Sequence, residues 1–429
     1  MKRKDMRSMA VATLDPMIEA LAERVSRERR YLHMHPELGL HETNTANFVA
    51  ENLREAGIPF RTGVGGDGRP FYMNADALKV AGIKTLPTTG GTGIVATIEG
   101  ARPGKCVILR GDMDALAMQE ETGADYASLT PNVMHACGHD VHTAVILNTA
   151  RVLWARRSEF AGTVKLMFQP GEEGYGGARA MIEDGLLENP TVDAAFALHV
   201  DPQVPVGQIA YTPGMANANS DRVFIRVHGK GGHAARPHSA VDSTLVAAHI
   251  LIALQSLISR ETDPTESAVI TIGTLQAGVG AANVIPEFAT LFGTVRTLNL
   301  EVREHIRRRI PEVASHIAQA MGATAETAYL TGYPAMVNNP AMCEVIRRAA
   351  LPIIGMENVK EKPLGLGGED FSFVLEQVPG AMMRLGTGNA ERGLTNGVHH
   401  PKFDVDERAL PLGVAMMTAI AMEYLGSNE

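Results

Sequence analysis

The segment MHACGHDVHTA, residues 134–144, holds one of the three cysteines and three of the fifteen histidines of the chain. Thiolate and imidazole are ligands for zinc and related divalent metals. Cys137 and His139 are two residues apart and would point to the same side of an extended segment, with Asp140 as a candidate N-cap for a following helix. This segment alone leaves three interpretations possible: a metal site, a thiol nucleophile and a histidine-rich helix.

Further acids and imidazoles follow three apolar runs. The runs are KCVILR (105–110), TVKLMF (163–168) and DAAFALH (193–199), and they end near Asp112 and Asp114, near Glu172 and Glu173, and on His199. Unbroken apolar runs predict strands buried on both faces of a mainly parallel sheet, whose ligands bind beyond the carboxyl ends of the strands. Three such coincidences at one edge favour the metal site.

The adjacent carboxylates of Glu172 and Glu173 suggest two different roles. One of Glu172 and Glu173 would bind metal while the other takes a proton from an activated water. Asp112 and Asp114 fit better as partners that orient a ligating histidine than as ligands themselves. The alternative for Glu172 and Glu173 is an acidic loop before a helix.

The surrounding pattern predicts two domains. Apolar strands alternating with helices at 141–156 and 178–187 indicate an α/β catalytic domain, residues 1–216 and 332–429. The N-terminal part adds helices at 14–32 and 42–56 and a long polar loop at 61–93. Between 217 and 331 the order β-α-β-β-α-β predicts an inserted α+β domain with one antiparallel sheet and helices on one face.

The composition limits which binding partners and which cellular compartment are expected for this protein. The net charge is −9 without a long basic run, which argues against a nucleic-acid partner. No segment is expected to approach the roughly 20 apolar residues of a membrane span, and no export signal is recognised in the basic N-terminus. Three scattered cysteines fit free thiols in a reducing compartment, so we expect a cytoplasmic protein.

An ordered set of motifs runs through nearly the whole chain. The set is RRYLHMHPELGLHE, LRGDMDAL, MHACGHDVHTA, FQPGEEG, ALHVDP, GKGGHAARPH, NVIP, GTVRT, GGEDFS and GVHHP. Together they resemble the di-metal amidohydrolases and carboxypeptidases that include aminoacylases, hippurate hydrolases and plant auxin-conjugate hydrolases. The resemblance implies a zinc-peptidase-like catalytic domain and a lid and dimerisation domain.

The resemblance also implies roles for particular residues. Two divalent ions (Zn, Mn, Co or Ni) would be held by Cys137, His139, Glu173, His199 and His400, with His399 as the alternative to His400. The catalytic residues it implies are Glu172 as general base, Asp114 as a support for the base or a ligand, and His233 as an oxyanion donor reaching across a homodimer or higher homo-oligomer. Substrate contacts would come from Arg296, Asn283 and Gly368, with the Arg296 guanidinium holding a free carboxylate.

We therefore expect a metal-dependent hydrolase that cleaves the amide bond of N-acyl amino acids. A carboxypeptidase or dipeptidase would use the same residues. A thiol hydrolase built on Cys137 and a non-catalytic metal-binding module are the remaining alternatives.

Overall fold

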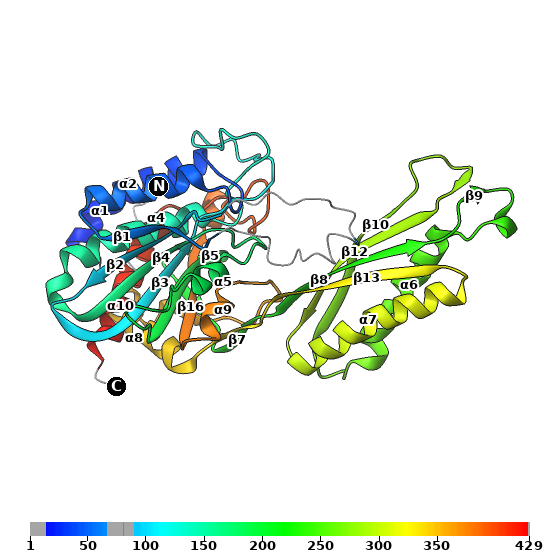
Figure 1. The fold of residues 1–429 in the computed structure, drawn as a ribbon. Coiled ribbons are helices and arrows are strands. Elements are labelled where there is room, and N and C mark those ends of the chain that lie inside the picture. The colour runs from blue at the N-terminus through cyan, green and yellow to red at the C-terminus, as the bar shows by residue number, and fades with distance from the viewer. Residues whose placement is uncertain (1–13, 67–79, 81–89, 428–429) are drawn as a thin grey trace, which may run out of the picture.

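The computed structural model describes residues 14–66, 80 and 90–427, which form two lobes joined by a narrow connection (Figure 1). The first lobe carries a large sheet with helices on both faces. The second lobe carries a smaller sheet with helices on one face. The first and the last described helices, Pro16–Met34 and Ala409–Gly426, both belong to the first lobe.

An eight-stranded sheet forms the first lobe, in the order β1-β2-β4-β3-β5-β16-β6-β15. The pairs β4–β3, β3–β5, β5–β16 and β6–β15 are parallel and the other three are antiparallel. The predicted mainly parallel α/β architecture is therefore confirmed. Its strands are β1 (Phe60–Val64), β2 (Gly93–Glu99), β3 (Arg102–Asp112), β4 (Ala161–Gln169), β5 (Ala194–Pro205), β6 (Ile209–Tyr211), β15 (Val359–Glu361) and β16 (Gly380–Gly388).

Alternate residues of the central strands face two different cores. In β3, Val107 and Leu109 belong to a core shared with the helices of one face, whereas Ile108 belongs to the core of the other face. The first face is covered by α1 (Pro16–Met34), α2 (Thr43–Glu55), α4 (His139–Ala155), α8 (Pro340–Ile354) and α10 (Ala409–Gly426). The second face is covered by α5 (Gly177–Glu183) and α9 (Ser372–Leu375).

The second lobe is a four-stranded antiparallel sheet in the order β10-β12-β8-β13. Its elements follow the chain as β8 (Asn219–His228), α6 (Ser243–Ser256), β10 (Ala268–Ala277), β12 (Phe288–Thr297), α7 (Leu300–Ala320) and β13 (Thr324–Tyr333). Both helices pack on one face and share a core with the sheet (Figure 1). This is the order of elements expected from the sequence, and the assignment of 217–331 as a separate domain stays a prediction.

The connection between the lobes is a pair of antiparallel segments. β7 (Gly214–Asn217) pairs with β14 (Met336–Asn338), and immediately beyond them Ser220 of β8 pairs with Tyr333 of β13. The chain therefore enters and leaves the second lobe side by side.

The expected long loop at 61–93 differs in part from the structure. Residues 60–64 form β1, which pairs with β2 from Gly93 onward. A short strand with exposed polar residues gives no apolar pattern, which is why the sequence did not predict it. Residues 67–79 and 81–89 of that loop lie outside the described residues, and Val80 packs against Ala328 and Leu330 of the second lobe.

Two helices are long and apolar enough to cross a membrane by length and composition, contrary to the expectation from the sequence. The first is Ala409–Gly426, whose window is 72% buried, as in a core helix of the first lobe. The second, Ser243–Glu261, is 33% buried and packs one side on the second sheet. Such helices are weak evidence for a membrane, and the cytoplasmic location stays a prediction.

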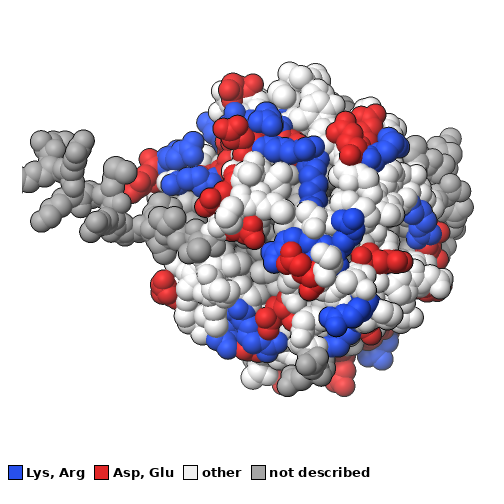
Figure 2. Space-filling model, turned by 90° about the vertical axis from the view of Figure 1, so that its left-hand side faces the viewer, with Lys and Arg blue, Asp and Glu red and all other residues white. Residues whose placement is uncertain are grey.

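Charges are mixed on the end of the first lobe that faces the viewer in Figure 2. Basic and acidic side chains are interspersed there, so this face forms no extended patch of a single sign (Figure 2).

Candidate metal centre

The loop before α4 brings Cys137 and His139 to the edge of the large sheet. Gly138 between them has φ 83°, and a Cβ there would lie 2.4 Å from Val200 Cγ2. This left-handed residue is the N-cap, so the helix begins at His139 and not after Asp140. The sequence interpretation of an extended Cys137–His139 segment capped by Asp140 is therefore wrong.

Five side chains from distant parts of the chain converge here. Cys137 Sγ lies 3.5 Å from His199 Nε2 and 3.3 Å from His399 Nε2, and His399 Nε2 lies 3.1 Å from Glu173 Oε1. His139 offers a donor atom within 4.8 Å of those of Cys137 and His199, and also of those of Glu172 and Glu173. Overlapping groups of sulfur, imidazole and carboxylate donors form a candidate site for divalent metal.

Hydrogen bonds fix which histidine nitrogens face the cluster. Asp114 Oδ1 lies 3.1 Å from His139 Nδ1, and the Val200 carbonyl lies 2.8 Å from His199 Nδ1, which leaves both Nε2 atoms for the centre. His139 Nε2 is buried without a hydrogen-bond partner among the described residues, and Glu173 Oε1 lies 3.1 Å from His399 Nε2. An orphaned imidazole nitrogen inside a group of sulfur, imidazole and carboxylate donors fits a bound cation.

His142 also lies beside the cluster, but both of its nitrogens are engaged. Its Nδ1 is 2.5 Å from Asp112 Oδ1, and its Nε2 accepts a hydrogen bond from the Val200 amide at 2.9 Å. Arg110 in turn contacts Asp112 at 2.7 Å. Asp112 and His142 thus form a buried layer beneath the metal donors.

The electrostatics of the cluster favour a cation over a nucleophilic thiolate. Burial and the neighbouring Glu173 raise the pKa of the Cys137 thiol, whereas a reactive cysteine needs a lowered pKa. Hydrogen bonds to Cys137 and Glu173 raise the pKa of His399 to about 10. A site that binds protons so strongly also attracts a metal ion, which would displace those protons.

The structure brings His399, and not the expected His400, into the cluster. His399 has φ 63°, which turns its ring toward Cys137, while His400 is exposed and its Nδ1 accepts from the Lys402 amide at 3.0 Å. Two adjacent histidines in a turn point in different directions, and only the backbone conformation decides which one faces the site. The expectation for His400 is corrected accordingly.

Glu172 lies beside the metal donors and over a second buried carboxylate group. It is 7% exposed, and its carboxylate lies within 4.8 Å of those of Glu369 and Asp370. Burial, Glu369 and Glu173 raise the pKa of Glu172 well above its usual value. A raised pKa suits a group that first accepts a proton and then returns it.

Arg110 holds the carboxylates beneath Glu172. Its guanidinium is fully buried and lies 3.0 Å from Glu369 and 3.2 Å from Asp370. Sequence reasoning missed this group because an arginine inside an apolar run gives no sign of what it will meet across the fold.

Four of the candidate metal donors, Cys137, Glu173, His199 and His399, line a cavity of about 920 Å³ between the two lobes. Besides the cluster, its walls include Ser220, Arg222 and Arg296 from the second sheet, and Gly368 and Arg384 from the first lobe. Arg296 donates to the backbone carbonyls of Val295 at 3.2 Å and Asp221 at 3.5 Å, and its guanidinium forms no ion pair with a carboxylate of the described residues. Arg296 and Gly368 therefore share the cavity with Glu172.

Two expected site residues do not line this cavity. His233 is exposed in β9 (Gly232–His233), which pairs with β11 (Val284–Ile285) next to Asn283. β9 lies at the outer end of the second lobe, far from the large sheet (Figure 1). Within one chain the structure does not bring His233 or Asn283 to the metal donors.

A buried network behind the cluster was also missed. His33 is 1% exposed, and its Nδ1 lies 2.7 Å from Asp140 Oδ2. The fully buried Arg29 contacts the same Asp140 oxygen at 2.7 Å. This network anchors the first turn of α4, which carries His139.

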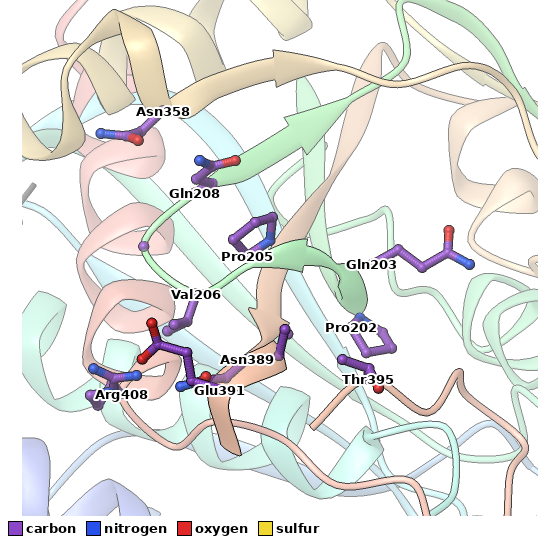
Figure 3. A pocket seen from close by; sticks show the side chains of 13 residues that line it. Pro202, Gln203, Pro205, Val206, Gln208, Asn358, Asn389, Glu391, Thr395 and Arg408 are labelled. Atoms are coloured by element: carbon purple, nitrogen blue, oxygen red, sulfur yellow. The ribbon is translucent and has the colours of Figure 1, made fainter. Parts of the chain in front are cut away.

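A smaller cavity of about 410 Å³ lies at the turn between β5 and β6 (Figure 3). Pro202 and Gln203 line both cavities, whereas Glu391 and Arg408 lie at the far side of the smaller one. Its lining contains no histidine or cysteine, so the chemistry belongs to the larger cavity.

Comparisons with known proteins agree with this site. The chain is 38% identical over 421 residues to the amidohydrolase YhaA of Bacillus subtilis, covering 97% of this chain and 99% of that protein. It is 35% identical over 401 residues to the N-acetyl-L-cysteine deacetylase of the same organism, covering 94% and 88%. Among solved structures, the Bacillus subtilis YXEP protein, a dinuclear metal binding peptidase, matches with a TM-score of 0.74 and 33% identity over 95% of this chain and 99% of that one.

The sequence profile of one family spans most of the chain. It matches residues 108–423, which include all of the metal donors described above. Together with the relatives that cover nearly the whole length, this match shows the kind of enzyme. The chain belongs to Peptidase family M20/M25/M40 and is a metal-dependent hydrolase of amide bonds.

Proposed function

We propose that this enzyme hydrolyses the amide bond of N-acyl amino acids. The observation that carries the proposal is a shared cavity. Glu172, Arg296 and four of the five proposed metal donors, Cys137, Glu173, His199 and His399, all line it. A proton acceptor and a carboxylate-binding group on opposite walls suit a small amide that ends in a free carboxylate.

Five residues would hold two divalent ions: Cys137, His139, Glu173, His199 and His399. When bound, such ions polarise a carbonyl group and lower the pKa of a water molecule. Asp114 keeps His139 oriented and also accepts from the Glu173 amide at 2.9 Å, so it positions two of the five ligands.

Glu172 acts as the general base and then as the general acid. Its carboxylate takes a proton from the attacking water and passes it to the nitrogen of the leaving amine. The Tyr333 hydroxyl donates to the Glu172 carbonyl at 2.7 Å and holds this backbone in place. The Arg296 fork binds the carboxylate of the substrate, with the Gly368 backbone close beside it.

The role of His233 requires a second copy of the chain. We propose a homodimer in which His233, aided by the segment of Asn283, reaches the cavity of the partner and donates to the oxyanion. The exposed position of His233 at the outer end of the second lobe supports this arrangement.

A carboxypeptidase or dipeptidase reaction would use the same groups, and it differs only in what occupies the acyl side of the cavity. The Cys137 thiol hydrolase is disfavoured by the raised pKa of the thiol. A non-catalytic binding module would leave the buried Glu172 without a task.

The deciding experiment measures release of free amine from N-acetyl and N-benzoyl amino acids, dipeptides and their C-terminal amides. The enzyme is assayed with added zinc or manganese, and again after exhaustive chelation and metal restoration. We expect hydrolysis that needs metal and is confined to substrates with a free carboxylate. Activity that survives chelation would contradict the metal mechanism, and a preference for dipeptides would select the peptidase alternative.

A further inference from the structure

Arg384 lies in the catalytic cavity, and the proposed reaction gives it no task. It is the only residue of β16 that is not buried, and it lines the cavity with Met382 of the same face. In the parallel pairing of β16 and β5 its neighbour is His199, one of the metal donors. Its charge therefore lies on the floor of the active site.

The guanidinium of Arg384 has a neutral partner. Its Nη2 donates to Asn217 Oδ1 at 3.3 Å, and no carboxylate of the described residues forms an ion pair with it within 4.0 Å. Two other charged residues of this cavity do have ion-pair partners, since Lys362 contacts Asp201 and Glu369 contacts Arg110. A half-buried guanidinium whose one hydrogen bond to the described residues goes to a neutral amide is poorly compensated by those groups alone.

The position of the Arg384 charge is also energetically unfavourable. A cation next to a metal ligand repels any cation bound there, and the repulsion is stronger in a cavity than in water. A purely structural bond to Asn217 needs no charge. A compensating anion from the substrate would explain why a guanidinium stands here.

We propose that Arg384 binds a second anionic group of the substrate, so that the preferred substrates are dianionic N-acyl amino acids. This inference rests on the proposed function, in which Arg296 of the second lobe binds the α-carboxylate. Arg384 then binds a further carboxylate with its planar fork, which suits bidentate contact with that group. The second carboxylate belongs either to the acyl chain or to the side chain of the amino acid.

The test compares substrate pairs that differ only in this charge. For the acyl chain the pair is N-succinyl-L-alanine and N-butanoyl-L-alanine. For the side chain it is N-acetyl-L-glutamate and N-acetyl-L-glutamine. The ratio of kcat/KM within each pair is measured for the metal-loaded wild type, for Arg384→Met and Arg384→Lys, and for Arg307→Met as a control at an exposed arginine of α7.

We expect the wild type to favour the dianionic member of one pair by about tenfold or more, the usual effect of one charge-assisted hydrogen bond. Arg384→Met removes that preference, Arg384→Lys keeps part of it, and Arg307→Met leaves it unchanged. The pair that responds locates the second carboxylate. Equal losses on every substrate, or no preference in the wild type, would overturn the proposal.

A binding measurement separates this inference from the proposed function. Calorimetry with the metal-loaded enzyme compares glutarate with butyrate, neither of which is turned over. We expect glutarate to bind more tightly than butyrate, and Arg384→Met to abolish the difference. If no N-acyl amino acid is hydrolysed, the proposed function fails, and an unchanged glutarate preference in Arg384→Met would then also overturn the role of Arg384.

Discussion

The two walls of the catalytic cavity are held in very different ways. On the first lobe, His139, Glu173 and Glu172 are buried or nearly so. Asp114 holds His139 and the Glu173 amide, and the Tyr333 hydroxyl holds the Glu172 carbonyl. On the second lobe, the hydrogen bonds of the Arg296 side chain to described residues go to backbone carbonyls, at 3.2 and 3.5 Å. The groups proposed for bond cleavage are thus preorganised, whereas the group proposed for substrate recognition is loosely held and lies on the other lobe.

This difference teaches where substitutions should act. Changes to Glu172 and to the proposed metal donors on the first lobe should lower kcat or metal content, because these residues are placed for chemistry and for ligation. Changes on the second wall should raise KM, because its residues meet only the substrate.

The largest effect is expected for Glu172→Gln. Loss of the proposed general base should lower kcat by about 10²- to 10⁴-fold, while metal content and KM change little. Activity assays and metal analysis of the purified enzyme check this. The matched variant Glu173→Gln should instead lose metal, and a loss of metal in Glu172→Gln would show that the two roles are exchanged.

Next come the two adjacent histidines of the C-terminal turn. His399→Ala should weaken metal binding by about tenfold to 100-fold or more, because its ring lies at the donors Cys137 and Glu173. His400→Ala is the control and should retain metal and activity. Metal titration of both variants tests this prediction. A loss of metal binding confined to His400→Ala would contradict it and support His400, the ligand assigned from the sequence.

A smaller effect is expected on the second wall. Arg296→Met should lower kcat/KM about tenfold to 100-fold for substrates with a free carboxylate, mainly through KM. C-terminal amide substrates, which lack that charge, should show little difference between the variant and the wild type. A drop in kcat alone would mean that Arg296 acts in the bond-breaking step.

The smallest effect is expected for Tyr333→Phe. Its hydroxyl donates to the Glu172 carbonyl at 2.7 Å and accepts from the Gly176 amide at 3.1 Å. Removing it should cost about 1 kcal/mol, seen as a severalfold lower kcat with unchanged metal content. Steady-state kinetics and metal analysis test this, and unaltered kinetics would show that this loop is held by other contacts.

Much of the fold was predictable from local pattern. The runs at 105–110, 163–168 and 193–199 became the central strands because buried parallel strands are apolar throughout. The alternation in DRVFIRVHG likewise indicated the half-buried β8. The predicted start of α4 was wrong, because Gly138 and not Asp140 is the N-cap.

The sequence predicted only those site residues whose type and spacing are distinctive by themselves. Cys137, His139 and the Glu172–Glu173 pair stand out by type and spacing. The choice of His399 over His400 depends on one backbone angle, and the placing of Arg110, His33 and Arg384 depends on contacts between segments far apart in the chain. No pattern along the sequence contains such contacts.

The paired segments that join the lobes have a mechanical consequence. The antiparallel ribbon of Asn217–Ser220 and Tyr333–Met336 bends readily across its face but resists sliding in its own plane, because its hydrogen bonds would have to break. A rotation of the second lobe relative to the first would therefore bend this ribbon more readily than shear it. Ser220 lines the cavity and the Tyr333 hydroxyl donates to the Glu172 carbonyl, so such a rotation would act directly on the proposed base.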